Sequence, residues 1–79
     1  MEINSLITID PNIQGGQPVF KGTRVPIETL FDHLEGGDSL NVFLEDFPSV
    51  TKELAISVLE TANKIMTSEK LKQLYEIVT

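Results

Sequence analysis

The 79-residue sequence contains no cysteine, no tryptophan and a single histidine, His33. The missing cysteines exclude disulfides and thiolate metal sites together. His33 cannot build a metal site without help from carboxylates, and we expect neither a metal nor a cofactor. A domain of this size buries about 60–65% of the surface of its unfolded chain, and small domains commonly gain stability from a disulfide, a metal or a partner. Association with another chain is therefore the expected reinforcement.

Basic residues are scarce as well. Six lysines and arginines stand against twelve aspartates and glutamates, which gives a net charge of −6. Nucleic-acid-binding proteins gain most of their non-specific affinity from Lys and Arg on phosphates, so this balance argues against tight, independent DNA binding. It favours a basic protein partner, or simply solubility. Long apolar runs and a leader-like N-terminus are also missing, which predicts a cytoplasmic protein with no membrane partner.

The apolar residues that are present predict one mainly α-helical domain over residues 1–79. A β and turn element is expected at 5–25, where residues 6–9 and 18–20 form a hairpin that Arg24-Val25 extends. Three helices form a core over 26–66, and a C-terminal helix follows over 67–79. The apolar faces of the core helices recur at helical spacing, through Ile27, Leu30, Phe31 and Leu34, then Leu40, Phe43, Leu44 and Phe47, then Leu54, Ala55, Val58, Leu59, Ala62, Ile65 and Met66.

Turn and capping residues set the expected boundaries of these helices. Pro26 suits the first turn of the first helix, and Gly36-Gly37 ends it. Side chains that accept a hydrogen bond from a helix N-terminus precede the later helices, namely Asp38 or Ser39, Ser49 or Thr51, and Thr67 or Ser68. The last of these caps makes the C-terminal segment a separate short helix or a bent continuation of the third.

Residues 15–26, Gly-Gly-Gln-Pro-Val-Phe-Lys-Gly-Thr-Arg-Val-Pro, concentrate three glycines and two prolines in a short space. Such density predicts a specified path of turns and short extended pieces rather than a helix interior. Together with Phe47-Pro48 before the third helix, this segment resembles the family known as domain of unknown function 433, over roughly residues 5–66. That family is described by G-K/R-P-V/I, G-T-R-I/V-P and Y-P motifs, from which Gln17 and Phe47 depart.

The resemblance implies a helix-turn-helix, homeodomain-like fold preceded by a small β element. It also implies an antitoxin role in prokaryotes, often beside a PIN-like ribonuclease toxin. Composition and periodicity by themselves indicate a short β element with three or four helices.

The Gly22-Thr23-Arg24 turn has two interpretations. In the architectural one, Thr23 satisfies local backbone groups and Arg24 pairs with a carboxylate such as Asp10 or Glu28. In the functional one, Arg24, with Lys21 and Thr23, contacts a phosphate or a carboxylate of a partner, for which the arginine fork is suited. The sequence leaves both open.

The second and third helices have the spacing of a helix-turn-helix pair, in which the second of the two enters the major groove N-terminus first. Its leading exposed residues would include Thr51, Lys52 and Glu53. Lys52 is the natural phosphate contact there, whereas Glu53 and Glu60 oppose the DNA backbone. DNA binding by this helix therefore needs a dimer or a partner that supplies charge.

A C-terminal seam of apolar residues is the stronger candidate for an interaction surface. It consists of Leu71, Leu74, Tyr75 and Val78, at helical spacing. The seam either covers the core as an extra helix, pairs with a second copy, or lies in a groove on a partner. An antitoxin would use it in the last way.

We therefore expect an antitoxin-like protein, a homodimer, that binds and neutralises a PIN-like toxin. The alternative is a helix-turn-helix autoregulator that binds operator DNA of its own operon. His33 is expected near a helix C-terminus as a partly exposed side chain. The acidic residues of the first two helices are expected on a solvated or partner-binding face, and no set of residues indicates an enzyme.

Overall fold

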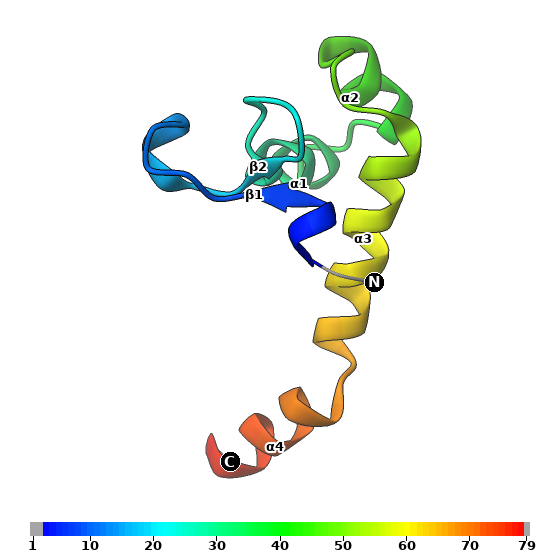
Figure 1. Ribbon diagram of the computed structural model, residues 1–79. Helices are drawn as coiled ribbons and strands as arrows, with labels where there is room; N and C mark the ends of the chain where they lie inside the picture. The colour runs from blue at the N-terminus through cyan, green and yellow to red at the C-terminus, as the bar shows by residue number, and fades with distance from the viewer. Residues whose placement is uncertain (1–2, 79) are drawn as a thin grey trace.

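The computed structural model describes residues 3–78, in which short elements follow one another along the chain (Figure 1). The first half holds η1 (a 3-10 helix, Ile3–Ser5), β1 (Ile7–Thr8), η2 (a 3-10 helix, Gln14–Gly16) and β2 (Val19–Phe20). The second half holds α1 (Ile27–Glu35), α2 (Leu40–Asp46), α3 (Lys52–Met66) and α4 (Glu69–Val78). The prediction of a mainly helical chain with an N-terminal β hairpin and a C-terminal helix is confirmed.

The hairpin is shorter than the sequence pattern suggests. β1 and β2 pair antiparallel, with Ile7 opposite Phe20 and Thr8 opposite Val19. Leu6 does not extend β1, because its N–H donates to the Ile3 carbonyl and closes η1. Val25 forms no strand, although Val19 and the adjoining Pro26 form an isolated antiparallel bridge. The chain between the two strands leaves the hairpin as a protruding loop (Figure 1).

The end of α1 is built as a Schellman motif. The Asp38 N–H donates to the His33 carbonyl at 2.9 Å, and the Gly37 N–H donates to the Leu34 carbonyl at 3.1 Å. Gly37 lies at φ +94°, a conformation that glycine adopts without a steric cost. Pro26 stands just before α1 at the N-cap rather than inside its first turn. The two glycines thus end α1 where the sequence predicts.

Hydroxyl side chains cap the two helices that follow. The Ser39 Oγ accepts a hydrogen bond from the Val42 N–H at 3.2 Å, and the Thr51 Oγ1 accepts from the Leu54 N–H at 3.1 Å. Each cap satisfies one of the donors that a helix leaves without an internal partner at its first turn. Of the paired alternatives, the structure uses Ser39 and Thr51.

Removing the cap of α3 tests this arrangement. Replacing Thr51 with Ala removes the acceptor for the Leu54 N–H and lowers the free energy of unfolding by about 1 kcal/mol. Thr51→Ser keeps the acceptor and serves as the control. Urea unfolding of the two variants beside the wild type measures the difference, and equal losses for Ala and Ser would contradict the cap.

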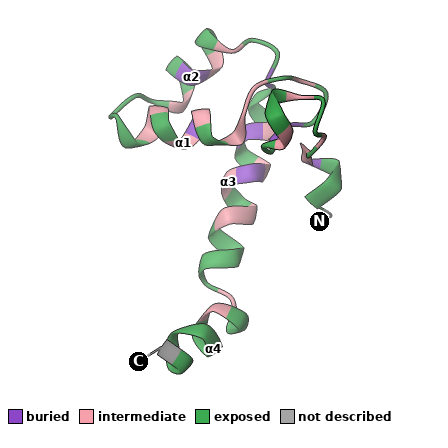
Figure 2. Ribbon diagram, turned by 90° about the vertical axis from the view of Figure 1, so that its left-hand side faces the viewer, coloured by how far each residue is buried: buried purple, intermediate pink, exposed green. Residues whose placement is uncertain are grey.

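The core lies where the hairpin, α1, α2 and the first half of α3 meet (Figure 2). Phe20, Leu30 and Phe43 are completely buried, and the rings of Phe20 and Phe43 pack with their centroids 5.9 Å apart. The other buried apolar side chains are Leu6, Val19, Val50, Ala55 and Val58. No polar side chain among the described residues is buried with them.

The apolar stripe of α3 outruns this core. Ala55 and Val58 are buried, but Ile65 and Met66 at the end of the helix are 54% and 64% exposed. The C-terminal end of α3 extends away from the core, and α4 follows it (Figures 1 and 2). The radius of gyration, 14.0 Å, exceeds the value of about 12 Å for a compact chain of this length. The core therefore covers only the first part of the apolar stripe, and Ile65 and Met66 lie outside it.

Candidate functional site

The C-terminal helix α4 carries the seam away from the core. Leu71 is half-buried, whereas Leu74 is 52% and Tyr75 67% exposed. The backbone of α4 extends to Val78, whose side chain lies outside the described part of the structure. None of the described seam residues belongs to the core cluster. The described part of the seam therefore does not cover the core as an extra core helix would.

Local hydrogen bonds fix the direction in which α4 leaves α3. The Thr67 hydroxyl donates to the Asn63 carbonyl at 2.8 Å, and the Ser68 hydroxyl donates to the Ile65 carbonyl at 2.9 Å. The same Ser68 oxygen accepts from the Leu71 N–H at 3.2 Å and caps α4. These hydrogen bonds stabilise the bend between α3 and α4 at residues 67 and 68. The segment α4 is therefore a separate helix.

The turn after β2 is held by Thr23. Its hydroxyl donates to the Phe20 carbonyl at 2.9 Å and accepts from the Val25 N–H at 3.0 Å. Gly22 lies at φ +78°, which allows the chain to reverse there. Thr23 is half-buried, and both hydrogen-bonding functions of its hydroxyl are used inside the turn.

Replacing Thr23 tests its place in the turn. Thr23→Val keeps the branched shape but leaves the Phe20 carbonyl and Val25 N–H without the hydroxyl, so we expect a loss of about 1–2 kcal/mol in the free energy of unfolding. Thr23→Ser retains the hydroxyl and is the matched control. Chemical denaturation measures both, and a Val variant as stable as wild type would contradict this structural role.

The basic candidates Lys21, Arg24 and Lys52 are all exposed. Lys21 and Arg24 flank the same turn, whereas Lys52 is the first residue of α3. Within residues 3–78, Arg24 has no ion pair, so the pairing with Asp10 or Glu28 that the architectural interpretation offered is not formed. These three cations are free to meet another molecule.

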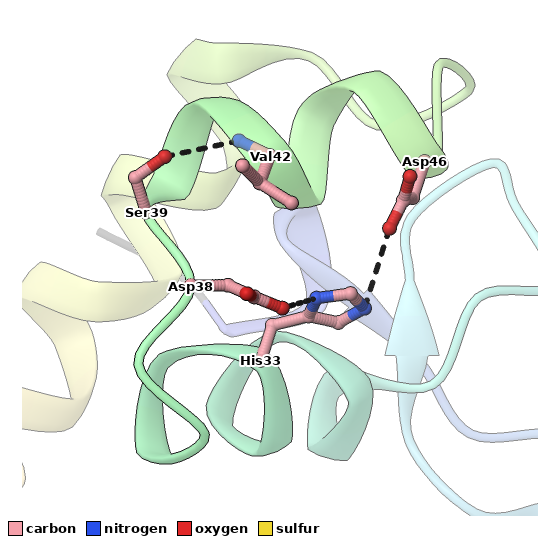
Figure 3. Close-up of polar contacts among 5 residues, drawn as sticks. All are labelled: His33, Asp38, Ser39, Val42 and Asp46. Carbon is pink, nitrogen blue, oxygen red and sulfur yellow. Dashed lines mark hydrogen bonds and ion pairs between the residues drawn. The ribbon is translucent and has the colours of Figure 1, made fainter.

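His33 holds a cluster that sequence patterns do not indicate (Figure 3). Its Nδ1 lies 2.9 Å from a carboxylate oxygen of Asp38, and its Nε2 lies 3.9 Å from one of Asp46. The ring also meets Phe43 and Phe47 edge-on, with centroid distances of 5.6 and 5.7 Å. His33 thereby links α1 by a hydrogen bond to the segment before α2 and by ring contacts to Phe43 and Phe47, and its side chain is 19% exposed.

This cluster is structural rather than a metal site. The two carboxylates lie on opposite nitrogens of the ring, so they do not converge on one point. Across residues 3–78, no three His, Asp or Glu side chains are grouped so that they could hold a metal ion. Among the same residues, no helix has the length and hydrophobicity needed to cross a membrane.

A second uncovered surface was missed at the level of sequence because it joins distant segments. An apolar groove of about 160 Å³ runs between η1, α1 and α3. Its apolar lining comes from η1, from Leu6 and β1, from α1 and from α3, and includes Ile3, Leu6, Ile7, Ile27, Phe31, Val58 and Ile65. Ile3 is 50% and Ile65 54% exposed along it. We refer to this surface as the apolar groove.

Comparison with known proteins places the chain in a family. Over 48 residues, 61% of this chain, it is 40% identical to "Uncharacterized protein y4eO" of Sinorhizobium fredii (strain NBRC 101917 / NGR234), and the match covers 22% of that protein. No solved structure matches the chain. Residues 7–60 match the family described as "Protein of unknown function (DUF433)". This match spans the hairpin, α1, α2 and most of α3, and the chain belongs to that family.

Proposed function

We propose that this chain is an antitoxin-like binding protein, not an enzyme, and that it neutralises a PIN-like ribonuclease in the cytoplasm. The observation that carries the proposal is the exposed apolar face of α4, where Leu74 and Tyr75 lie outside the core. A helix of this kind binds by laying its apolar face into a groove of the partner. The family resemblance supplies the class of partner.

The chemistry of α4 suits such a role. Leu71, Leu74 and Tyr75 recur at the spacing of one helix face, while Lys70 and Lys72 keep the flanks polar. Tyrosine is enriched among the residues that dominate binding energy at interfaces. The helix is already formed and capped by Ser68, so less conformational entropy is lost on binding than with a disordered segment.

The acidic surface supports a basic partner. Glu28, Asp32 and Glu35 line one side of α1 and are exposed, and Glu45 and Asp46 are exposed on α2. With a net charge of −6, the chain attracts a basic nuclease and speeds the encounter of the two. Binding then covers the RNA-binding site of the nuclease or distorts it.

Co-purification from the native cell tests the partnership. A tagged chain is recovered at moderate salt, and every co-purifying protein is identified. We expect one small basic nuclease of the PIN type in equimolar amount, encoded beside this chain. Recovery of the tagged chain alone would contradict a stable complex.

A second candidate function is autoregulation through operator DNA. Exposed Lys21, Arg24 and Lys52 favour it, because each is available to a phosphate. Glu53 and Glu60 on α3 oppose it, since they would face the same negative backbone. Binding of a fragment of the chain's own promoter should then weaken steeply as salt rises. The absence of binding, even for a complex with the nuclease, would dismiss this function.

A further inference from the structure

The apolar groove lies open beside the lower half of α3. Its volume of about 160 Å³ is close to the ~150 Å³ cavity that admits a benzene ring, so it has room for one large side chain. The groove continues at both ends into adjoining hollows, because Ile3 and Ile65 also line the next hollow toward α4, and Ile27 and Phe31 line the next one along α1. A short helix could therefore lie along it, with one apolar side chain in its deepest part.

The α4 helix of the same chain does not fill the groove. Ser68 and Lys70 reach its lower hollow, but Leu71, Leu74 and Tyr75 line neither that hollow nor the groove. The hydrogen bonds of residues 67 and 68 hold α4 in this direction. Within one molecule, the apolar face of α4 does not reach the groove, so the groove and this face both stay uncovered.

We propose that the groove receives α4 of a second copy, so that two chains exchange their C-terminal helices in a two-fold symmetric dimer. Each copy then supplies one helix and one groove, and the contact is made twice. The central apolar contacts would be made by Leu71, Leu74 and Tyr75 of one chain on Phe31, Val58 and Ile65 of the other. Two of the large exposed apolar side chains, Ile3 and Ile65, line the groove, and two others, Leu74 and Tyr75, belong to the seam.

The accessible area agrees with a missing partner. The chain exposes 5596 Å², whereas a folded monomer of 8.8 kDa is expected to expose about 4,800 Å². The excess of about 800 Å² matches the ~800 Å² that each partner buries in an interface of standard size. A dimer formed through α4 and the groove would bury the surface that makes this chain so open.

The charges complement one another across the same contact. Glu28, Asp32 and Glu35 form an acidic rim at the α1 end of the groove. Lys70 and Lys72 flank the seam on α4 and are exposed, and the Lys72 Nζ lies 3.3 Å from a carboxylate oxygen of Glu69 on the same helix. In the exchanged dimer Lys70 approaches an acidic rim on the other chain, which favours the encounter of two molecules that repel each other overall.

This inference goes beyond the proposed function and does not depend on it. A chain that dimerises but binds no nuclease would support the dimer and contradict the antitoxin role. A chain that binds the nuclease but stays monomeric would support the antitoxin role and contradict the dimer. If both hold, the nuclease and the second copy compete for α4.

The molar mass of the full-length chain, measured by light scattering over a concentration series, tests the dimer. We expect a mass of twice 8.8 kDa. Ile65→Ser in the groove and Leu74→Ser on α4 should each raise the dimer dissociation constant by at least about a hundredfold, because each substitution acts at two symmetric contacts. Ile56→Ser is the matched control, because Ile56 lies on α3 like Ile65 but outside the groove. This variant should leave the dimer dissociation constant unchanged.

Mixing the two variants separates exchange from other dimers. The Leu74→Ser chain keeps an intact groove, and the Ile65→Ser chain keeps an intact α4, so a heterodimer has one wild-type contact and one contact that carries both substitutions. Leu74 and Ile65 would meet in that contact, so the loss of the second partner adds little to the loss of the first. The heterodimer should therefore be about tenfold tighter than either variant alone. A wild-type chain that stays monomeric throughout would overturn the proposal. So would a mixture that gains nothing, or an Ile65→Ser chain that dimerises normally, since the latter would indicate α4 packing on α4.

Discussion

Phe43→Ala should lower the free energy of unfolding by about 3–5 kcal/mol, as buried Phe-to-Ala changes do. Phe43 is completely buried and contacts three rings, those of Phe20, His33 and Phe47. Its removal opens a cavity at the point where the hairpin, α1 and α2 meet, and the surrounding helices cannot close it without breaking the His33 cluster.

The effect is large relative to the whole stability of the chain. A domain of 79 residues has about 4–12 kcal/mol of stability in total, so Phe43→Ala removes a major part of it. Thermal unfolding at one fixed protein concentration should show a Tm at least about 12 °C lower. Val42→Ala, at the neighbouring and 38% exposed position, is the control. A Tm shift no larger than that of the control would contradict the core as described.

Leu74→Asp should weaken nuclease binding by at least about thirtyfold, the loss typical of a residue that dominates an interface. The change places a charge in the middle of the apolar face of α4, where an apolar groove of the partner cannot solvate it. Leu74 is 52% exposed and does not belong to the core cluster. At a protein concentration where the wild-type chain is monomeric, the Tm of the Leu74→Asp chain should therefore hardly change.

Gln73→Asp is the matched control for this prediction. It adds the same charge at the adjacent, exposed position, which lies outside the seam. Calorimetric titration of the nuclease with each variant measures affinity, and thermal unfolding measures stability. A Leu74→Asp chain that binds like Gln73→Asp would show that the seam is not the binding surface. A large fall in Tm at a concentration where the wild-type chain is monomeric would show that α4 belongs to the core.

Local sequence signals predicted much of this fold because they act over a few residues. Gly36-Gly37 ends α1, and Ser39 and Thr51 cap α2 and α3, each through contacts with residues three to five positions away. The Schellman motif and the caps can therefore be predicted from the residues at each helix end. The strand predicted from residue 6 is longer than β1, because the Leu6 N–H donates to the Ile3 carbonyl and closes η1.

Contacts between distant segments could not be predicted in the same way. The periodicity of α3 identifies an apolar face that includes Ile65 and Met66, but it does not predict how far along the helix other elements cover that face. The apolar groove joins η1 to α3 across more than fifty residues. The His33 cluster likewise depends on the angle between α1 and α2, and the apolar periodicity of a single helix does not predict that angle.

The role of α4 in neutralising a nuclease is tested most directly by an RNA-cleavage assay. The purified PIN-like nuclease encoded beside this chain is titrated with the wild-type protein and with Leu74→Asp. We predict that wild-type chain stops cleavage at equimolar ratio and that Leu74→Asp fails to do so at the same ratio. Cleavage that continues in an excess of wild-type chain, or inhibition by Leu74→Asp equal to that by wild type, would contradict the role assigned to this helix.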